Sequence, residues 1–225
     1  MILKGDVSSD HQYLARGSDW HPAHNIYYIL DENYMNMEPF KDMATYLKDS
    51  KVAKALSDKP KVYTSHVRMF WKSARYDEKE KMIFSAVPKK DDNDKDTDIK
   101  VKFNVGDVRR VLHLRDSDDG PIIVPEKLCK GLWFRMGFIG HVNDKYLKST
   151  FCRPYKFLVH GGVHALSHSK GGYDETSDYI MNIITCLVLI RPYNISQVLF
   201  DHMIDNIKGE KYIIYPRFIQ MLLND

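Results

Sequence analysis

The chain has 225 residues, of which 44% are hydrophobic and 28% are charged, so it can bury a sizeable core and is not disordered as a whole. The 33 Lys and Arg residues nearly balance the 30 Asp and Glu residues; the net charge of +3 excludes a histone-like polycation but leaves room for a local basic face. The 3 cysteines are widely spaced and form no CxxC pair, which argues against a disulfide framework or a zinc ribbon and favours a reducing compartment.

Residues 1–38 are rich in polar residues and turn formers and follow neither a helical nor a strand period, which predicts an N-terminal arm or linker. They also lack the pattern of a signal peptide. The longest apolar run, from Tyr179 to Ile190, is shorter than the roughly 20 residues that a membrane span needs. We therefore expect no membrane partner and an intracellular protein of the cytoplasm or nucleus, with a helical domain at 39–225.

The first part of that domain carries apolar residues at helical spacing. A helix is expected after Pro39, which suits a first helical position, and a short one at 52–56. The segment 61–75 is the clearest amphipathic helix, because its apolar residues share one face. Its basic residues share the opposite face: Lys61, Arg68, Lys72 and Arg75.

The pattern then changes to that of strands. Residues 81–87 and 99–105 predict two strands, and the second alternates cleanly with period two. Between them, the charged run 89–98 contains no apolar residue. Two strands around such a segment predict an antiparallel β-hairpin with a long, exposed loop.

Helices resume after the hairpin. Asn104 is expected to cap the first of them, and Asp174 to cap a strongly apolar one ending at Ile190, which predicts the central core helix. Gly161 and Gly162 weaken another helix, since each internal glycine costs about 1 kcal/mol. That helix and the others expected here lie at 154–168, 125–136, 196–207 and 216–223. The predicted fold is mainly α with one β-hairpin, an α+β fold in which about seven or eight helices form an irregular bundle.

Three histidines form the sharpest local pattern. His160, His164 and His168 would fall on one side of a helix, and two histidines one turn apart can chelate zinc. The pattern lacks the Glu of HExxH and straddles the two glycines, so packing or surface roles are favoured over metal binding. A metal-binding protein or metal-dependent enzyme that uses this His-x3-His-x3-His helix is the alternative function, and we expect no cofactor.

Known catalytic patterns do not occur in the sequence. It contains no GxSxG elbow and no phosphate-binding GxxxxGK[ST] or GxGxxG loop. The acidic turn from Asp116 to Gly120 fails the register of an EF-hand calcium loop. We therefore predict no enzyme and no catalytic residue.

Basic residues on one face could contact phosphates. Besides the basic stripe of segment 61–75, Arg109, Arg110 and Arg115 could widen a nucleic-acid-binding patch if the fold brings them close. The alternative is that the stripe is only the solvated face of an amphipathic helix, and this simpler interpretation is favoured.

Five strings resemble a known family, the plant transposon protein domain of retrotransposon-derived reading frames, in their order and spacing. They are Tyr63 to Trp71, Val108 to Leu114, Leu132 to Phe138, Phe157 to Leu166 and Lys211 to Asn224. The resemblance runs from about Pro39 to the end, and the family is Gag-like by position.

This resemblance implies a non-catalytic structural or nucleic-acid-associated domain of a plant retrotransposon-like element, with RNA or DNA bound through a weak basic face, or with self-association. The family supplies no catalytic residues to carry over. A degenerate element without retained activity would fit the sequence as well, and the last expected helix, ending two residues before Asp225, would fit a fragment of a longer reading frame.

Overall fold

The structure is a computed structural model, which describes residue 25 and residues 40–90, 96–139, 146–168, 174–209 and 212–225. The predicted fold class is confirmed: the described part of the chain forms nine α-helices and one three-stranded antiparallel sheet. The helices are α3 (Lys41–Asp49), α4 (Ala53–Ser57), α5 (Thr64–Ser73), α6 (Val105–Val111), α7 (Glu126–Arg135), α8 (Arg153–Leu166), α9 (Asp178–Val188), α10 (Ile195–Lys208) and α11 (Pro216–Leu223). A short 3-10 helix, η1 (Lys148–Thr150), precedes α8.

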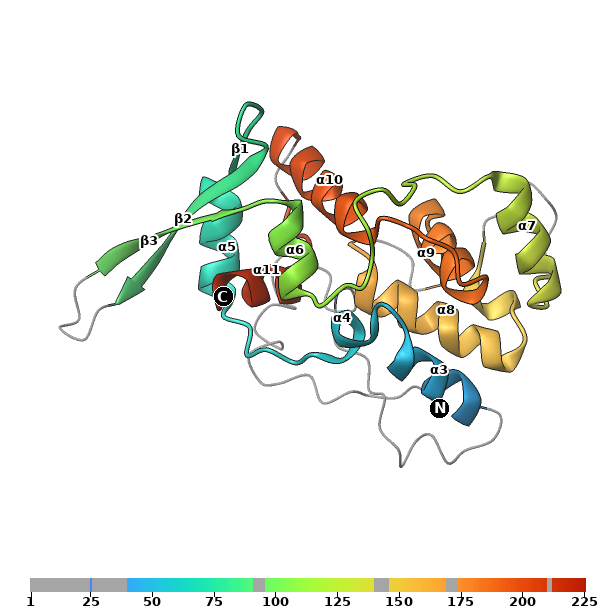
Figure 1. The fold of residues 1–225 in the computed structure, drawn as a ribbon. Helices are drawn as coiled ribbons and strands as arrows, with labels where there is room; N and C mark the ends of the chain where they lie inside the picture. The colour runs from blue at the N-terminus through green and yellow to red at the C-terminus, as the bar shows by residue number, and fades with distance from the viewer. Residues whose placement is uncertain (1–24, 26–39, 91–95, 140–145, 169–173, 210–211) are drawn as a thin grey trace.

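The sheet lies at one end of the molecule and α7 at the other (Figure 1). Its strands are β1 (Arg75–Asp77), β2 (Met82–Lys90) and β3 (Asp96–Phe103), in the order β1-β2-β3. The expected hairpin is β2–β3, with Ile83 opposite Phe103. Buried Ile83, Val87 and Phe103 form its inner face, where the Ser85 hydroxyl donates to the Phe70 carbonyl of α5 at 3.0 Å.

Three details of the sheet were predicted wrongly. The strands extend into the charged run 89–98, since Lys89 pairs with Thr97 and Lys90 with Asp96; residues 91–95 lie outside the described part. β3 ends at Phe103 because Asn104 starts α6. The strand β1, where the end of a helix was expected, was missed.

The short β1 is held by the turn that joins it to β2. The Asp77 carboxylate accepts the backbone N–H groups of Lys79 and Glu80 at 2.9 and 3.0 Å, and Lys81 has a φ of 53°. This Asx-type turn returns the chain beside Arg75 without a glycine. The helix α5 ends at Ser73, before the basic stripe of the sequence is complete.

One helix cap was predicted correctly and one was not. Asn104 accepts from the N–H groups of Gly106 and Asp107, while Asp107 accepts from the N–H of Asn104, a complete capping box. Asp174 does not cap the apolar helix, because α9 begins four residues later; its carboxylate instead accepts from Ser149.

The apolar helix α9 packs in the core beside α8. Ile180, Ile183, Ile184 and Leu187 are buried as expected, whereas Val188 is only partly buried. The glycines do not break α8: a side chain at Gly162 would meet Ile180 and Ile184 at 3.3 Å, so the missing side chain lets the two helices approach closely.

The predicted arm at 1–38 lies outside the described residues except for Asn25, which is buried. Its amide donates to Ala165 O of α8, and its Oδ1 accepts the N–H of Arg217 at the start of α11. The buried Arg217 guanidinium in turn donates to backbone carbonyls, including those of Ala55 and Asp58. One point of the N-terminal segment is thus bonded to α8 and α11, and Arg217 links it to α4.

Candidate nucleic-acid interface

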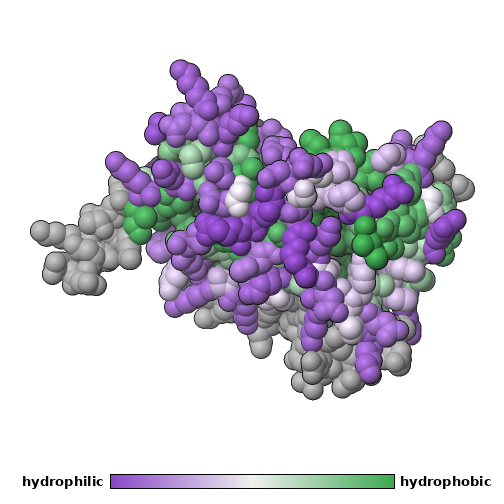
Figure 2. All heavy atoms as spheres, in the orientation of Figure 1, coloured by the Kyte–Doolittle hydropathy of each residue, from purple (hydrophilic) through white to green (hydrophobic). Residues whose placement is uncertain are grey.

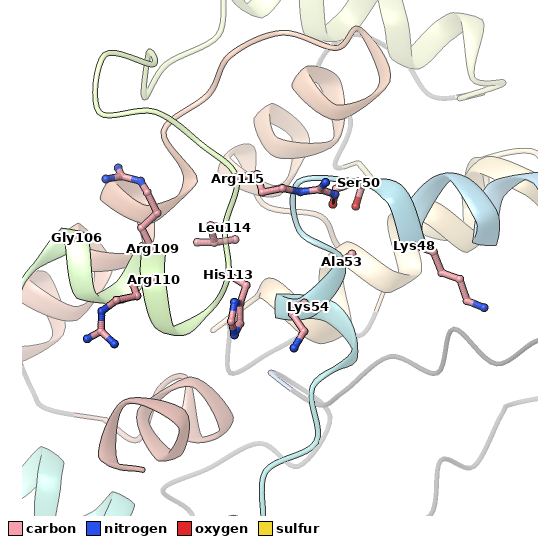
Figure 3. A pocket seen from close by; sticks show the side chains of 10 residues that line it. All are labelled: Lys48, Ser50, Ala53, Lys54, Gly106, Arg109, Arg110, His113, Leu114 and Arg115. Carbon is pink, nitrogen blue, oxygen red and sulfur yellow. Dashed lines mark hydrogen bonds between the residues drawn. The ribbon is translucent and has the colours of Figure 1, made fainter. Parts of the chain in front are cut away.

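A hollow of about 550 Å³ opens between α3 and α4 on one side and α6 on the other (Figure 3). Six of its ten lining residues are basic, and none is acidic. The basic residues are Lys48, Lys54, Arg109, Arg110, His113 and Arg115. We call this surface the basic hollow.

The two sides of the basic hollow are joined by Arg115. Its guanidinium donates to the carbonyls of Asp49 and Ser50, at 2.5 and 2.6 Å, and its backbone N–H donates to Lys51 O at 3.1 Å. Carbonyls at the end of a helix carry partial negative charge, so a guanidinium suits the C-terminal end of α3. This contact sets the position of α6 relative to α3 and α4.

His113 has an unusual backbone conformation, with a φ of 50°. It follows α6 in a Schellman motif: its own N–H donates to Arg110 O at 3.1 Å, and the next N–H donates to Arg109 O at 2.9 Å. The left-handed residue of this motif is most often glycine. Here it is an exposed imidazole, which lies between Arg110 of α6 and Lys54 of α4 in Figure 3.

The two arginines of α6 differ in their surroundings. Arg109 bonds at 2.7 Å to Asp116, whose side chain is fully buried and also accepts from Ser196 at the start of α10. The role of Arg109 is therefore structural, because Asp116 links it to the start of α10. Arg110 is exposed and makes a two-pronged contact with Asp225 at 2.5 and 2.7 Å.

The Arg110 contacts fix its charge. Hydrogen bonds to Asp225 and to Asp107 raise the pKa of its guanidinium, so it stays a cation at any physiological pH. Both contacts lie at the surface, where an ion pair contributes little and can be exchanged for another anion.

The structure does not keep the predicted basic stripe on one helix. Only Arg68 and Lys72 lie on α5, where both are exposed. Lys61 precedes the helix and lies 5.1 Å from the centre of the Tyr63 ring, and Arg75 belongs to β1. The six predicted residues therefore fall into separate groups, and only Arg109 and Arg110 line the hollow.

The three histidines do not come together either, because α8 ends at Leu166, before His168. The rings of His160 and His164 lie 4.0 Å apart, each with a ring nitrogen 3.3 Å from the Lys148 ammonium. His168 instead packs against Tyr179 and His202. Within the described residues no group of three or more His, Cys, Asp or Glu side chains is placed to hold a metal ion.

Burial favours the neutral imidazoles of His160, His168 and His202, because it lowers their pKa values. It lowers the pKa of His160 to about 4, with a further contribution from the nearby charge of Lys148. It also lowers the pKa of His202 to about 3, and the pKa of the neighbouring His168. Burial likewise raises the pKa of the Cys129 and Cys186 thiols, which makes them poor nucleophiles.

Sequence reasoning did not find Lys48, Lys54 or His113. The lysines lie on the exposed side of two short helices, a position typical of any solvated surface. Their proximity to α6 depends on the tertiary contact of Arg115, for which the sequence holds no local signal. The left-handed position of His113 could have been suspected only from the end of the helix that Asn104 caps.

Comparison with known proteins gave no match, either to a family model, to a curated protein or to a solved structure. The family resemblance of the five strings stays a prediction. In the described part of the chain, no helix is both long and apolar enough to span a membrane.

Proposed function

We propose that the chain is a non-catalytic, nucleic-acid-associated domain that contacts phosphate groups through the basic hollow. One observation carries the proposal: six basic side chains from separate segments line a single concavity without an acidic residue among the ten that line it. Lysine and arginine bind phosphates by releasing condensed counterions. A concave cationic surface also concentrates polyanions from solution.

The exposure of the hollow favours a nucleic-acid backbone over a small enclosed ligand. Lys48, Lys54, Arg110 and His113 are all exposed, so a phosphate could reach them without any change in the core. Contacts of this kind position a nucleic acid but carry no base information. We expect RNA and DNA to bind weakly and without sequence preference.

The five family-like strings support the biological setting of this proposal. A plant retrotransposon-like element would supply its own RNA and DNA as partners, in the cytoplasm or nucleus. The lowered pKa values of the partly buried His160 and His202 and the raised thiol pKa values of Cys129 and Cys186 support a role without catalysis.

A binding titration with charge variants tests the proposal. We expect the Lys48→Ala/Lys54→Ala variant to bind a 20-base-pair DNA duplex more weakly than the unchanged protein at low salt. The matched control is Lys127→Ala/Arg135→Ala, which removes two exposed cations from α7 (Figure 1). Equal losses in both variants would show that only net charge matters and would overturn a specific role of the hollow.

Self-association is a second candidate function, favoured by an exposed apolar patch. Ile122, Ile123 and Ile190 are 43%, 75% and 82% exposed. The segments that carry them are joined where the Tyr193 hydroxyl donates to Ile122 O at 3.1 Å. Figure 2 shows hydrophobic residues gathered on the side of the molecule with α7 and α9. Sedimentation of an Ile123→Asp variant tests it, and a concentration-independent monomer before the substitution would contradict it.

A further inference from the structure

The outer face of the sheet, unlike the basic hollow, carries an apolar strip on its middle strand. Side chains alternate along a strand, so the residues between the buried ones of β2 point away from α5. These are Met82, Phe84 and Ala86, all only half-buried. The middle strand thus presents an apolar strip on the solvent side.

Cations flank this apolar strip on both neighbouring strands. Across the β1–β2 ladder, Phe84 lies opposite Arg75, whose guanidinium is 5.4 Å from the centre of the Phe84 ring. Across the β2–β3 ladder, Phe84 lies opposite Lys102, and Ala86 lies opposite Lys100. Arg75, Lys100 and Lys102 are exposed.

The acid nearest to Phe84 in register does not cancel these charges, and Asp98, opposite Pro88, lies further along β3. Asp77 lies opposite Met82, at the end of the sheet, and its carboxylate is engaged by the backbone of the turn that follows β1. Glu78 in the same turn pairs with Lys208 of α10 at 3.1 Å. The described outer face around Phe84 is therefore a cationic surface with an aromatic centre.

We propose that this outer face binds a single-stranded nucleic acid. A base stacks on the Arg75–Phe84 pair, and the adjoining phosphates contact Lys100 and Lys102. Unpaired bases stack on aromatic rings and on guanidinium planes, and this stacking tolerates any sequence. A duplex keeps its bases stacked and paired, so it can offer this surface only its backbone.

The dimensions of the sheet agree with a short strand of nucleotides. Three strands cover about 10 Å, because neighbouring strands lie about 4.8 Å apart. The two phosphate contacts of Lys100 and Lys102 on a single strand give a log–log salt slope of about −1.4. The proposal rests on the nucleic-acid association proposed above, but it assigns a second surface and a specific strand form.

Fluorescence anisotropy with a 12-nucleotide single-stranded RNA and a DNA duplex of equal length tests this proposal. We expect Phe84→Ala to weaken single-strand binding by about 5- to 150-fold, the loss that follows removal of one stacked base. Duplex binding should stay within twofold. Phe84→Tyr keeps the ring and should retain single-strand affinity, which separates stacking from a general loss of structure.

The variants also separate the two surfaces. Loss of single-strand binding in Phe84→Ala, but not in Lys48→Ala/Lys54→Ala, supports the sheet-face proposal. Unchanged duplex binding in Lys48→Ala/Lys54→Ala would overturn the proposal for the basic hollow, but not the one for the sheet face. Equal losses on single strand and duplex, unchanged single-strand affinity in Phe84→Ala, or no single-strand binding at low salt would each overturn the sheet-face proposal. So would Phe84-dependent binding to phosphatidylserine vesicles without binding to RNA.

Discussion

Single residues in the left-handed backbone region terminate several helices of this protein. Gly137, with a φ of 84°, follows α7 in a Schellman motif, in which the N–H groups of Gly137 and Phe138 donate to Phe134 O and Trp133 O. Ile190 takes the same place after α9, with a φ of 52° and the corresponding bonds to Leu187 O and Cys186 O. A β-branched residue is strained in this conformation, whereas glycine is not.

We therefore predict that Ile190→Gly stabilises the protein, by up to about 1 kcal/mol, because it removes this strain. The side chain is 82% exposed, so little buried area is lost with it. Urea unfolding measures the change, and a loss of stability would show that the Ile190 side chain makes contacts that outweigh the strain. If the apolar patch mediates self-association, the same variant should weaken it.

A second residue-scale prediction concerns acid stability. The folded-state pKa of His202 is lowered to about 3 by burial and by the neighbouring His168. In the unfolded chain a histidine titrates near 6.5, so below that pH the unfolded state takes up a proton that the native state does not. The contribution of the neutral His202 to the free energy of unfolding is thus fully present above about pH 6.5 and is lost as the pH falls toward 3.

The expected slope is about 1.4 kcal/mol per pH unit for each such histidine. His202→Gln should reduce the slope of the unfolding free energy against pH by about one proton between pH 6 and pH 4, whatever its effect on stability at pH 7. Urea unfolding at several pH values provides the comparison. An unchanged slope would mean that the imidazole of His202 titrates normally in the folded protein.

At the scale of elements, the close packing of α8 on α9 decides the centre of the core. Gly162 faces Ile180 and Ile184, whereas a side chain at Gly131 of α7 would meet nothing within 4 Å. We predict that Gly162→Leu destabilises by about 1–3 kcal/mol through overpacking. Gly131→Leu should instead stabilise by roughly 0.5–1 kcal/mol, because glycine is a poor helix former.

A cavity on the α9 side of the contact between α8 and α9 should also destabilise the protein. Ile184→Ala is expected to lose about 2–5 kcal/mol, because the fully packed site leaves a void. Thermal unfolding of the three variants shows whether α8 and α9 form the core contact. Similar effects of leucine at the two glycine positions would contradict that role.

Local patterns predicted most elements but not their contacts. The cap at Asn104, the helical spacing of α7 and the alternation of β3 each depend on a few neighbouring residues. β1 has only three residues and depends on pairing with β2, so no period could show it. The predicted helix 61–75 was too long at both ends, because a helical period was extended beyond the true bounds of α5, Thr64 and Ser73.

At the scale of the whole molecule, the cationic groups of the candidate sites come from distant parts of the chain. Arg115 brings α6 beside α3 and α4, while the sheet brings Arg75 beside residues of β3. The sequence contains both sets of basic residues, but it does not show which of them share a surface. A net charge of only +3 is therefore compatible with two surfaces on which basic residues gather, although Lys54, Arg109 and Arg110 form ion pairs.

The salt dependence of duplex binding tests the phosphate role of the basic hollow most directly. If Lys48 and Lys54 contact phosphates, the Lys48→Ala/Lys54→Ala variant should lower the magnitude of the log–log slope by about 1.8, since each contact contributes roughly 0.9 on duplex DNA. The Lys127→Ala/Arg135→Ala control should leave the slope unchanged. An unaltered slope in the hollow variant, or an equal change in the control, would contradict phosphate binding in the hollow.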